Sequence, residues 1–403
     1  MIIAGEASGD FHSSSLIHAL KKINPGIEIS GMGGQRMREA GARLLFDTSE
    51  LSIIGFTGVL ANLRKIKKVF NGLLEAIDER PPDAIVLVDY PGFNLKLARE
   101  IKKRKIPVIY YISPQVWAWW KGRIKTIGRF VDKMIVVFKF EEALYRDSGV
   151  DASFVGHPLL DIAHPAVSRE DFLNKSGLSP QRQTIGLVPG SRKMEVERIL
   201  PILLESARLI KEKSPDTQFA LLKAPGLPGE FFTNAIARSN SSLSLRGAQR
   251  RSNPLLRLLR PFGARNDGDV SLPLTLCENQ TYDFLNACDF ALVASGTATL
   301  ETAIMQKPML LVYKVSFLNW LIARALIKLP FIGLVNVVAG KKIVPEFVQY
   351  KAKPRLIAEK ALEILGSRER LREVKADLEK VRQGLGAPGA SRRAAEIISR
   401  FIG

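Results

Sequence analysis

Cysteine is scarce in this chain, which has only Cys277 and Cys288 among its 403 residues. Two cysteines are too few for the disulfide framework that stabilises small secreted domains. We therefore expect two reduced thiols in the core of a cytosolic protein.

Long hydrophobic runs are also missing. No apolar stretch reaches about 18 residues without a charge, so the sequence predicts no transmembrane helix. The nearest candidate, residues 317–339, is interrupted by Arg324 and Lys328. Met1 leads directly into an apolar strand pattern, and we expect no signal peptide.

Acidic residues are outnumbered: 40 Asp and Glu face 59 Lys and Arg, which gives a formal net charge of +19. Such an excess indicates an anionic partner, which is nucleic acid, anionic lipid or a phosphorylated substrate. The sequence shows no zinc-ligand spacing, no aromatic RNA-binding strand motif and no clear helix-turn-helix. We therefore expect a membrane surface or a phosphorylated ligand, and no nucleic acid partner.

The chain is longer than one hydrophobic core usually organises, so its length predicts two domains. A short strand, a turn of small residues and a helix occur at the N-terminus and again from residue 184. This unit is typical of a doubly wound α/β sheet. We predict similar α/β domains at residues 1–165 and 183–383, and a terminal helix at 390–403 that packs back on the first domain.

The most informative stretch is residues 288–301. Residues 290–294 predict a strand buried on both faces, because they are apolar without alternation. Ser295, Gly296 and Thr297 then form a small turn at the start of a helix, where backbone N–H groups attract phosphate. Glu301 follows about one helical turn later and can accept hydrogen bonds from ribose hydroxyls. The alternative is an ordinary strand-to-helix junction with an exposed Glu.

Residues 5–10 predict a similar turn after the first strand. Ser8 and Gly9 can present N–H groups to a ligand there, and Glu6 and Asp10 are candidates for the lining of a pocket. The alternative is that these residues only close the turn. Residues 31–34 do not complete a dinucleotide-binding motif, because Arg36 occupies the third glycine position, and they predict a strand-to-helix turn.

Asp89 is the candidate general base. Residues 84–88 predict a buried strand, and Asp89 lies at its carboxyl end before a Pro-Gly turn. Ligands of open parallel sheets bind outside the carboxyl ends of the strands, where a carboxylate can accept a proton. The alternative is an Asp that caps a helix.

The second half of the chain offers two further candidates for ligand binding. Arg192 lies in a Pro-Gly-Ser-Arg turn after a predicted strand, and its guanidinium suits a diphosphate. A surface Arg is the alternative. Asn336 is polar within an apolar run, and a buried Asn needs hydrogen-bond partners, of which a ligand is one option. His157, which precedes a proline, is assigned a structural role.

Residues 51–77 are rich in both apolar and basic side chains. A membrane-facing patch is predicted here, with apolar side chains from Phe56, Ile66, Val69, Phe70, Leu73 and Leu74. Its basic rim consists of Arg64, Lys65, Lys67 and Lys68. The alternatives are a helix packed on the chain's own core and a homodimer contact. A second contact of the same character is predicted at Phe317, Trp320, Arg324 and Lys328.

Residues 236–270 break the α/β pattern. They are rich in Arg, Ser, Asn and Gly and show no hydrophobic periodicity. We expect an inserted and largely disordered loop.

Seven short blocks, in order along almost the whole chain, resemble lipid-A-disaccharide synthases. They are AGEASGD at 4–10, VLVDYPGFN at 86–94, SPQVWAW at 113–119, FVGHP at 154–158, VPGSR at 188–192, ASGTATLE at 294–301 and NVVAG at 336–340. Each block is weak alone, and their common order makes the resemblance specific. The segment at 236–270 departs from the family.

The resemblance implies a GT-B glycosyltransferase with two Rossmann-like domains facing a central cleft. The family joins UDP-2,3-diacylglucosamine to 2,3-diacylglucosamine 1-phosphate (lipid X), forms a β-1,6-linked disaccharide phosphate and releases UDP, without a cofactor or required metal. It implies a peripheral enzyme on the cytoplasmic face of the inner membrane. By this resemblance Asp89 would deprotonate the acceptor. The donor-side residues would be Arg192, Ser295, Gly296, Thr297, Glu301 and Asn336.

Two other functions fit parts of the pattern. One is a transferase of the same fold that uses UDP-N-acetylglucosamine and a lipid-linked acceptor of peptidoglycan synthesis, against which the blocks at 86–94 and 113–119 argue. The other is a non-catalytic basic protein that binds nucleic acid, which predicts a steep dependence of binding on salt.

Overall fold

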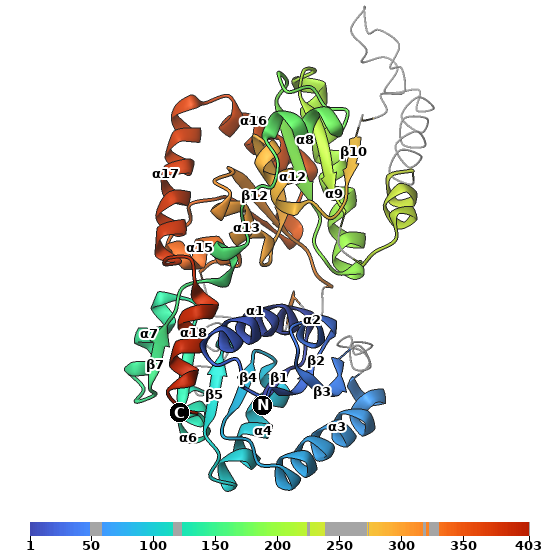
Figure 1. The fold of residues 1–403 in the computed structure, drawn as a ribbon. Helices are drawn as coiled ribbons and strands as arrows, with labels where there is room; N and C mark the ends of the chain where they lie inside the picture. Colours follow the sequence, from blue (N-terminus) through green and yellow to red (C-terminus); the bar gives the residue numbers. More distant parts are fainter. Residues whose placement is uncertain are drawn as a thin grey trace, which may run out of the picture. The chain divides into compact units, whose positions relative to one another are not determined.

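The computed structural model describes residues 1–48, 59–115, 123–223, 226–237, 272, 274–316, 320–321 and 330–402. The chain forms two compact units, residues 1–162 with 383–403, and residues 163–382 (Figure 1). Most of the predicted insert, from residue 238 onward, lies outside the described residues, as do residues 116–122 with their three tryptophans.

The first unit contains a seven-stranded sheet in which every paired strand is parallel. Its strands are β1 (Ile2–Ala4), β2 (Ser30–Gly33), β3 (Arg43–Asp47), β4 (Ile85–Val88), β5 (Val108–Tyr111), β6 (Lys133–Val136) and β7 (Ala152–Phe154). Its helices are α1 (Ala7–Ile23), α2 (Gln35–Glu39), α3 (Val59–Glu79), α4 (Pro91–Lys103), α6 (Arg123–Phe130), α7 (Lys139–Arg146), the 3-10 helix η2 (Pro158–Asp161) and α18 (Ala390–Ser399). The strand order is β3-β2-β1-β4-β5-β6-β7.

Helices cover this sheet on both faces, which explains why its central strands are apolar without alternation. Ile85 and Leu87 of β4 face a core cluster that contains Leu73 of α3 and Leu97 of α4. Val88 follows Leu87 on the same strand and therefore faces the other side of the sheet, where it is also buried. On the other side of the sheet α1 packs along α18 (Figure 1). The terminal helix thus belongs to the first unit.

The second unit contains a six-stranded parallel sheet. Its strands are β8 (Thr184–Val188), β9 (Gln218–Leu222), β10 (Leu274–Cys277), β11 (Phe290–Ala294), β12 (Met309–Tyr313) and β13 (Glu346–Val348). Its helices include α8 (Arg169–Lys175), α9 (Lys193–Lys213), α12 (Thr281–Ala287), α13 (Ala298–Ile304), α15 (Leu334–Ala339), the 3-10 helix η3 (Gln349–Lys351), α16 (Pro354–Leu365) and α17 (Arg368–Gly384). The strand order is β10-β9-β8-β11-β12-β13.

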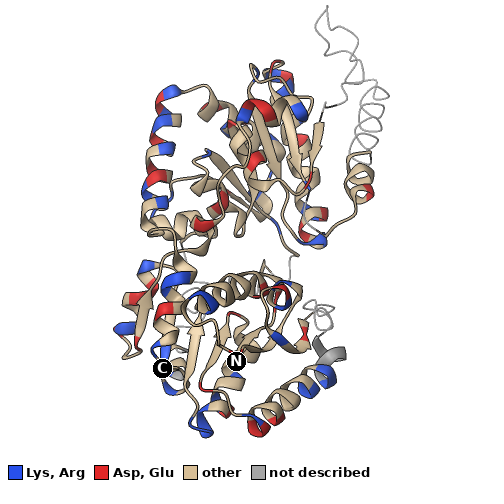
Figure 2. Ribbon diagram, viewed as in Figure 1, with Lys and Arg blue, Asp and Glu red and all other residues tan. Residues whose placement is uncertain are grey.

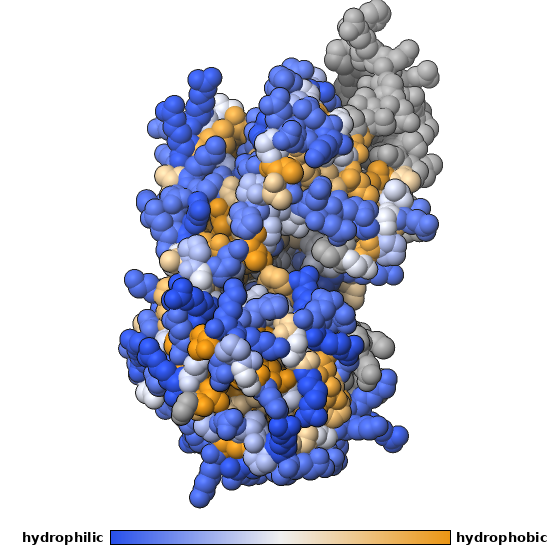
Figure 3. Space-filling model, viewed as in Figure 1, coloured by the Kyte–Doolittle hydropathy of each residue, from blue (hydrophilic) through white to orange (hydrophobic). Residues whose placement is uncertain are grey.

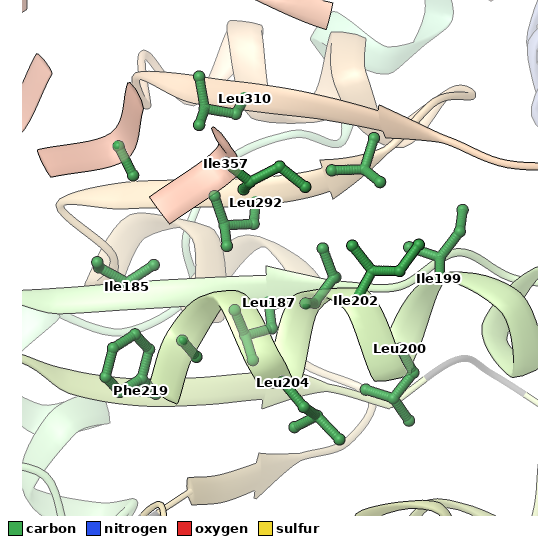
Figure 4. Close-up of a cluster of buried hydrophobic side chains, with 14 of the residues drawn as sticks. Ile185, Leu187, Ile199, Leu200, Ile202, Leu204, Phe219, Leu292, Leu310 and Ile357 are labelled. Atoms are coloured by element: carbon green, nitrogen blue, oxygen red, sulfur yellow. The ribbon is translucent and has the colours of Figure 1, made fainter. Parts of the chain in front are cut away.

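The core of this unit joins α9 and α16 to one face of the sheet. Leu187 of β8 and Leu292 of β11 lie beside Ile202 of α9 and Ile357 of α16 (Figure 4). Cys288 lies at the end of α12 and is 1% exposed, and both cysteines are free buried thiols. The prediction of core cysteines is confirmed. The polar segment before β8 carries α8, which packs on α12 within the second unit.

Candidate active site

Each sheet changes its direction of strand addition at one place. In the first unit the chain moves outward from β1 to β2 and β3, then returns to add β4 beside β1. The second unit repeats this arrangement with β8 and β11. Ligands of open α/β sheets bind at such switch points, outside the carboxyl ends of the strands. Glu6 and Asp89 follow β1 and β4, and Arg192 and Ser295 lie just beyond β8 and β11.

Asp89 lies directly after β4 in a backbone conformation that residues other than glycine rarely adopt. Its φ angle is 47°, and that of Tyr90 is 48°. Left-handed conformations cost on the order of 1–2 kcal/mol per residue and cluster at functional sites. Helix α4 takes Tyr90, not Asp89, as its N-cap residue, so the helix-capping alternative for Asp89 is wrong.

The environment of Asp89 favours proton acceptance near neutral pH. Burial, followed by the nearby charge of Glu6, raises the pKa of the Asp89 carboxyl to about 6. A hydrogen bond from the backbone N–H of Tyr90 opposes this rise. A general base is most effective when its pKa lies near the operating pH, so this carboxylate suits the role.

Gly5 allows the loop after β1 to approach the loop after β4. A Cβ atom on Gly5 would lie 2.1 Å from Cδ1 of Tyr90, so no other residue fits against this ring. Tyr90 also stacks on Phe93 with 5.8 Å between ring centroids. The two loops that flank the switch point are therefore packed together through one aromatic ring.

The predicted turn at residues 5–10 is shorter than expected. Helix α1 begins at Ala7, so Ser8 and Gly9 lie in its first turn, with Glu6 as the N-cap residue. Glu6 and Ser8 are exposed, whereas Gly9 is buried against Ala4. Glu6 and Ser8 are thus the members of this set that solvent and ligands can reach.

Asp10 does not line a pocket, and that prediction is wrong. Its carboxylate accepts hydrogen bonds from the backbone N–H groups of Gly34 at 2.7 Å, Arg36 at 3.2 Å and Met37 at 3.1 Å. These groups are unpaired donors at the start of α2, which Asp10 caps from outside. The turn at residues 31–34 is confirmed as a strand-to-helix turn, with Asp10 as its partner.

We expect Asp10→Ala to reduce stability rather than catalysis. The substitution leaves three N–H groups, two of them buried, without their acceptor, which costs about 1.5–3 kcal/mol when a charged partner is removed. Urea unfolding should show this loss in the free energy of unfolding of the first unit, while kcat per folded molecule stays close to wild type. Glu75→Ala on α3, an exposed site, is the matched control. A large loss of kcat without a loss of stability would contradict this structural role and indicate that Asp10 belongs to the active site.

In the second unit, Glu195 holds the turn that carries Arg192. Its carboxylate accepts from the backbone N–H of Ser191 at 3.0 Å, and burial raises its pKa while the Ser191 and Arg192 N–H groups oppose the rise. Gly190 has φ 109°, and a Cβ there would lie 2.3 Å from Cδ of Glu195. Because these N–H groups already donate to Glu195, they are not available to an anion. Anion binding at this turn therefore depends on the exposed Arg192 side chain.

The structure places the Ser295–Thr297 turn between β11 and α13, and Glu301 in the first turn of α13, as the sequence predicts. Gly296 and Thr297 are exposed, and the Ser295 hydroxyl donates to the carbonyl of Ile332 at 3.4 Å. Glu301 is partly buried, and the Tyr282 hydroxyl donates to its Oε1 at 3.1 Å. Burial raises the pKa of Glu301, and this hydrogen bond opposes the rise. The exposed-Glu alternative is therefore wrong.

Asn336 is fully buried, and protein groups satisfy its side chain. Its Nδ2 donates to the Val344 carbonyl at 2.9 Å and to Glu346 Oε1 at 2.8 Å. Its Oδ1 accepts from the N–H groups of Ile343 and Val344. Direct donor binding by Asn336 is thus a wrong prediction. Its role is to hold the loop before β13, with Glu346.

His157 has the structural role that the sequence predicts. Its Nδ1 accepts from the N–H of Leu159 at 3.2 Å, at the start of η2. Burial lowers its pKa to about 3, so the imidazole is neutral at physiological pH.

The structure corrects the apolar part of the predicted membrane patch. Leu73 is fully buried in the core of the first unit. Four other members pack against that core and are partly buried, namely Ile66, Val69, Phe70 and Leu74. Phe56 lies outside the described residues, as do Phe317, Arg324 and Lys328. Figure 3 shows hydrophobic and hydrophilic side chains interspersed on the visible face of the first unit.

Comparison with known proteins identifies the family. The family model for lipid-A-disaccharide synthetase matches residues 1–253 and 263–401. The chain belongs to this family. It is therefore a glycosyltransferase of lipid A biosynthesis.

Curated relatives of this synthase family carry the same name. Lipid-A-disaccharide synthase of Syntrophus aciditrophicus is 45% identical over 402 residues, which are 100% of this chain and 97% of the relative. That of Geobacter sulfurreducens is 40% identical over 403 residues, with 100% and 97% coverage. These matches cover the whole chain and therefore span both switch points.

Solved structures confirm the two-domain α/β fold. The glycosyltransferase of kitacinnamycin matches with a TM-score of 0.64 at 15% identity, covering 100% of this chain and 98% of that one. UDP-GlcNAc 2-epimerase from Neisseria meningitidis, bound to UDP-GlcNAc, matches with a TM-score of 0.61 at 10% identity, covering 99% of each chain. At these identities the likeness concerns the fold alone.

Proposed function

We propose that the enzyme transfers 2,3-diacylglucosamine from its UDP derivative to the 6-hydroxyl of 2,3-diacylglucosamine 1-phosphate, with inversion, and releases UDP. Membership of the lipid-A-disaccharide synthetase family, with Asp89 at the switch point of the first sheet, carries this proposal, and the raised pKa of Asp89 supports it. Asp89 accepts the proton of the acceptor hydroxyl as the oxygen attacks the anomeric carbon, and the bond to UDP breaks. Inversion in one step requires one base and a stabilised leaving group.

The second unit binds the leaving group in this proposal. Arg192 neutralises the diphosphate, and the turn Ser295–Thr297 contacts phosphate oxygens. Glu301 accepts hydrogen bonds from the ribose hydroxyls through the carboxylate oxygen that Tyr282 leaves available. All these groups lie at the switch point of the second sheet, and this shared position supports the proposal. The switch point is formed by β8 and β11, which pair directly with Val188 opposite Val293.

A donor comparison tests the proposal. UDP release is measured with lipid X as acceptor and with either UDP-2,3-diacylglucosamine or UDP-N-acetylglucosamine as donor. We expect release with the diacylated donor alone, at the same rate in EDTA. Release with UDP-N-acetylglucosamine and a peptidoglycan-type acceptor would support the other transferase instead.

The pH dependence should report the environment of Asp89. Only the carboxylate accepts a proton, so kcat/KM should fall about tenfold per pH unit below a pKa of about 6. Glu6 raises that pKa because its negative charge disfavours a second one nearby. Glu6→Gln should therefore move the acid limb to lower pH, whereas Glu75→Gln should not. If the acid limb of Glu6→Gln stays at the wild-type pH, a group other than Asp89 is responsible for that limb.

Membrane association at the cytoplasmic face is part of the same proposal, because both substrates carry acyl chains. The N-terminal half of α3 bears Arg64, Lys65, Lys67 and Lys68, all of which are exposed. Figure 2 shows this basic half, with acidic residues toward the other end of the helix. Such clusters attract anionic lipid at about 1 kcal/mol per basic residue. No described helix is long and apolar enough to cross a membrane.

Charge removal on α3 tests this contact. Lys67→Gln with Lys68→Gln should weaken binding to phosphatidylglycerol-containing vesicles by about 2 kcal/mol, or roughly 30-fold, in sedimentation assays. The matched control, Lys351→Gln with Lys353→Gln, makes the same charge change at exposed sites of the second unit. Equal losses in both variants would indicate a general charge effect. Unchanged vesicle binding in both variants would indicate that Lys67 and Lys68 face solvent or a homodimer contact instead of the membrane.

A further inference from the structure

Two buried side chains from different elements hold the backbone of Asp89. Tyr110 of β5 is fully buried, and its hydroxyl donates to the carbonyl oxygen of Asp89 at 2.5 Å. Asn94 of α4 is also fully buried, and its Nδ2 donates to the same oxygen at 2.7 Å and to the carbonyl of Val88 at 3.2 Å. One carbonyl group is therefore fixed from two directions.

This carbonyl belongs to a strained segment. Asp89 and Tyr90 both have positive φ angles, and neither is a glycine, the residue that adopts such angles without strain. Such conformations persist only where the surroundings impose them. The backbone N–H of Asp89 also donates to the carbonyl of Tyr111 at 3.2 Å, so both backbone polar groups of Asp89 are bonded.

The donors keep their protons at physiological pH. Burial raises the pKa of Tyr110 well above its ordinary value, and the charge of Asp89 raises it further. The Tyr110 hydroxyl is consequently a permanent donor to the Asp89 carbonyl, and it carries no negative charge that would repel the nearby carboxylate.

We infer that Tyr110 and Asn94 are positioning residues for Asp89, which they hold in the left-handed conformation that directs its carboxylate toward the acceptor hydroxyl. The inference rests on the proposed role of Asp89 as the base. A base must lie within hydrogen-bond reach of the proton it removes, and a displacement of about 1 Å can cost about 100-fold in rate. The effect should appear in kcat, since the proposed UDP-binding residues all belong to the second unit.

The adjacent residue supplies a matched control. Tyr111 is also fully buried on β5, but it has the opposite parity along the strand, and its hydroxyl lies near Ser391 of α18. Tyr110→Phe and Tyr111→Phe thus remove the same atom from the same strand. Only the first removes a hydrogen bond to the Asp89 carbonyl.

The experiment measures kcat, KM for the donor, and UDP affinity in the full-length enzyme. We expect Tyr110→Phe to lower kcat by about 10-fold to 100-fold with unchanged UDP affinity. Tyr111→Phe should remain near wild type. In an Asp89→Asn background, Tyr110→Phe should lower the residual turnover by less than about twofold, because residues that act as a unit are not additive. Asn94→Leu, similar in size, repeats the test from α4 if Tyr110→Phe fails to fold.

The outcomes separate this inference from the proposed function. Normal turnover of Tyr110→Phe, with an inactive Asp89→Asn enzyme, would overturn the positioning role and leave the base assignment intact. Independent, multiplicative losses in the double variant would also overturn it. Near-normal turnover of Asp89→Asn would refute the base assignment itself, and the positioning role with it.

Discussion

Asp89→Asn should lower kcat by about 10²–10⁴-fold, the usual cost of losing a general base. The amide has nearly the shape of the carboxylate, but it cannot accept the acceptor proton. The hydrogen bonds from Tyr110 and Asn94 go to the backbone carbonyl of residue 89, so the loop should keep its conformation.

UDP affinity is the control for this variant. It should be unchanged in Asp89→Asn, because the proposed UDP site lies in the second unit. The thermal midpoint at pH 8 should be equal or higher, since the variant removes a buried carboxylate whose ionised form is disfavoured. Near-normal turnover would transfer the base role to Glu6, the exposed acid that follows β1 at the same switch point.

Arg192→Ala should have the second largest effect, on UDP binding. A charge-assisted hydrogen bond contributes about 1.5–3 kcal/mol, which corresponds to roughly 10-fold to 100-fold in the dissociation constant. The backbone N–H groups of this turn are bonded to Glu195, so they offer an anion little compensation for the lost guanidinium. Isothermal titration with UDP measures the effect directly.

Two variants sharpen the interpretation of Arg192. Lys193→Ala removes the adjacent exposed charge and should change UDP affinity much less. Arg192→Lys keeps the charge but loses the planar fork, so its affinity should fall between wild type and Arg192→Ala. Equal affinities in Arg192→Ala and wild type would remove Arg192 from the donor site.

The strand–turn–helix units were predictable from sequence because they depend on local pattern. Residues 290–294 form the predicted strand, and residues 5, 89, 192 and 295 follow strands, as expected. Once the strands are parallel, their carboxyl ends share an edge. The positions of the main site residues therefore follow from sequence and fold class together.

Partners from distant segments were not predictable from sequence. The partners of Asp10 lie within the segment 34–37 and those of Asn336 within the segment 343–346, so both polar side chains have partners within the protein. The sequence pattern of a buried polar residue is the same whether its partner is a ligand or another loop. Tyr110 and Asn94 were missed because a strand Tyr and a helix Asn give no local signal of the carbonyl that they hold.

The apolar surface of α3 was overestimated for a similar reason. Its hydrophobic residues outnumber what one helix face needs, but Leu73 and Ile77 pack into a broad core beside the sheet. The basic residues of the helix are the part that remains exposed. This division explains why the membrane proposal now depends on charge.

The most direct test of the central claim is the structure of the product. Wild-type enzyme is incubated with UDP-2,3-diacylglucosamine and lipid X, and the product is analysed by mass spectrometry and NMR. The account predicts a disaccharide 1-phosphate with a β-1,6 linkage, formed in equal amount to the UDP released. An α linkage, attachment at another hydroxyl, or UDP release without a disaccharide would contradict it.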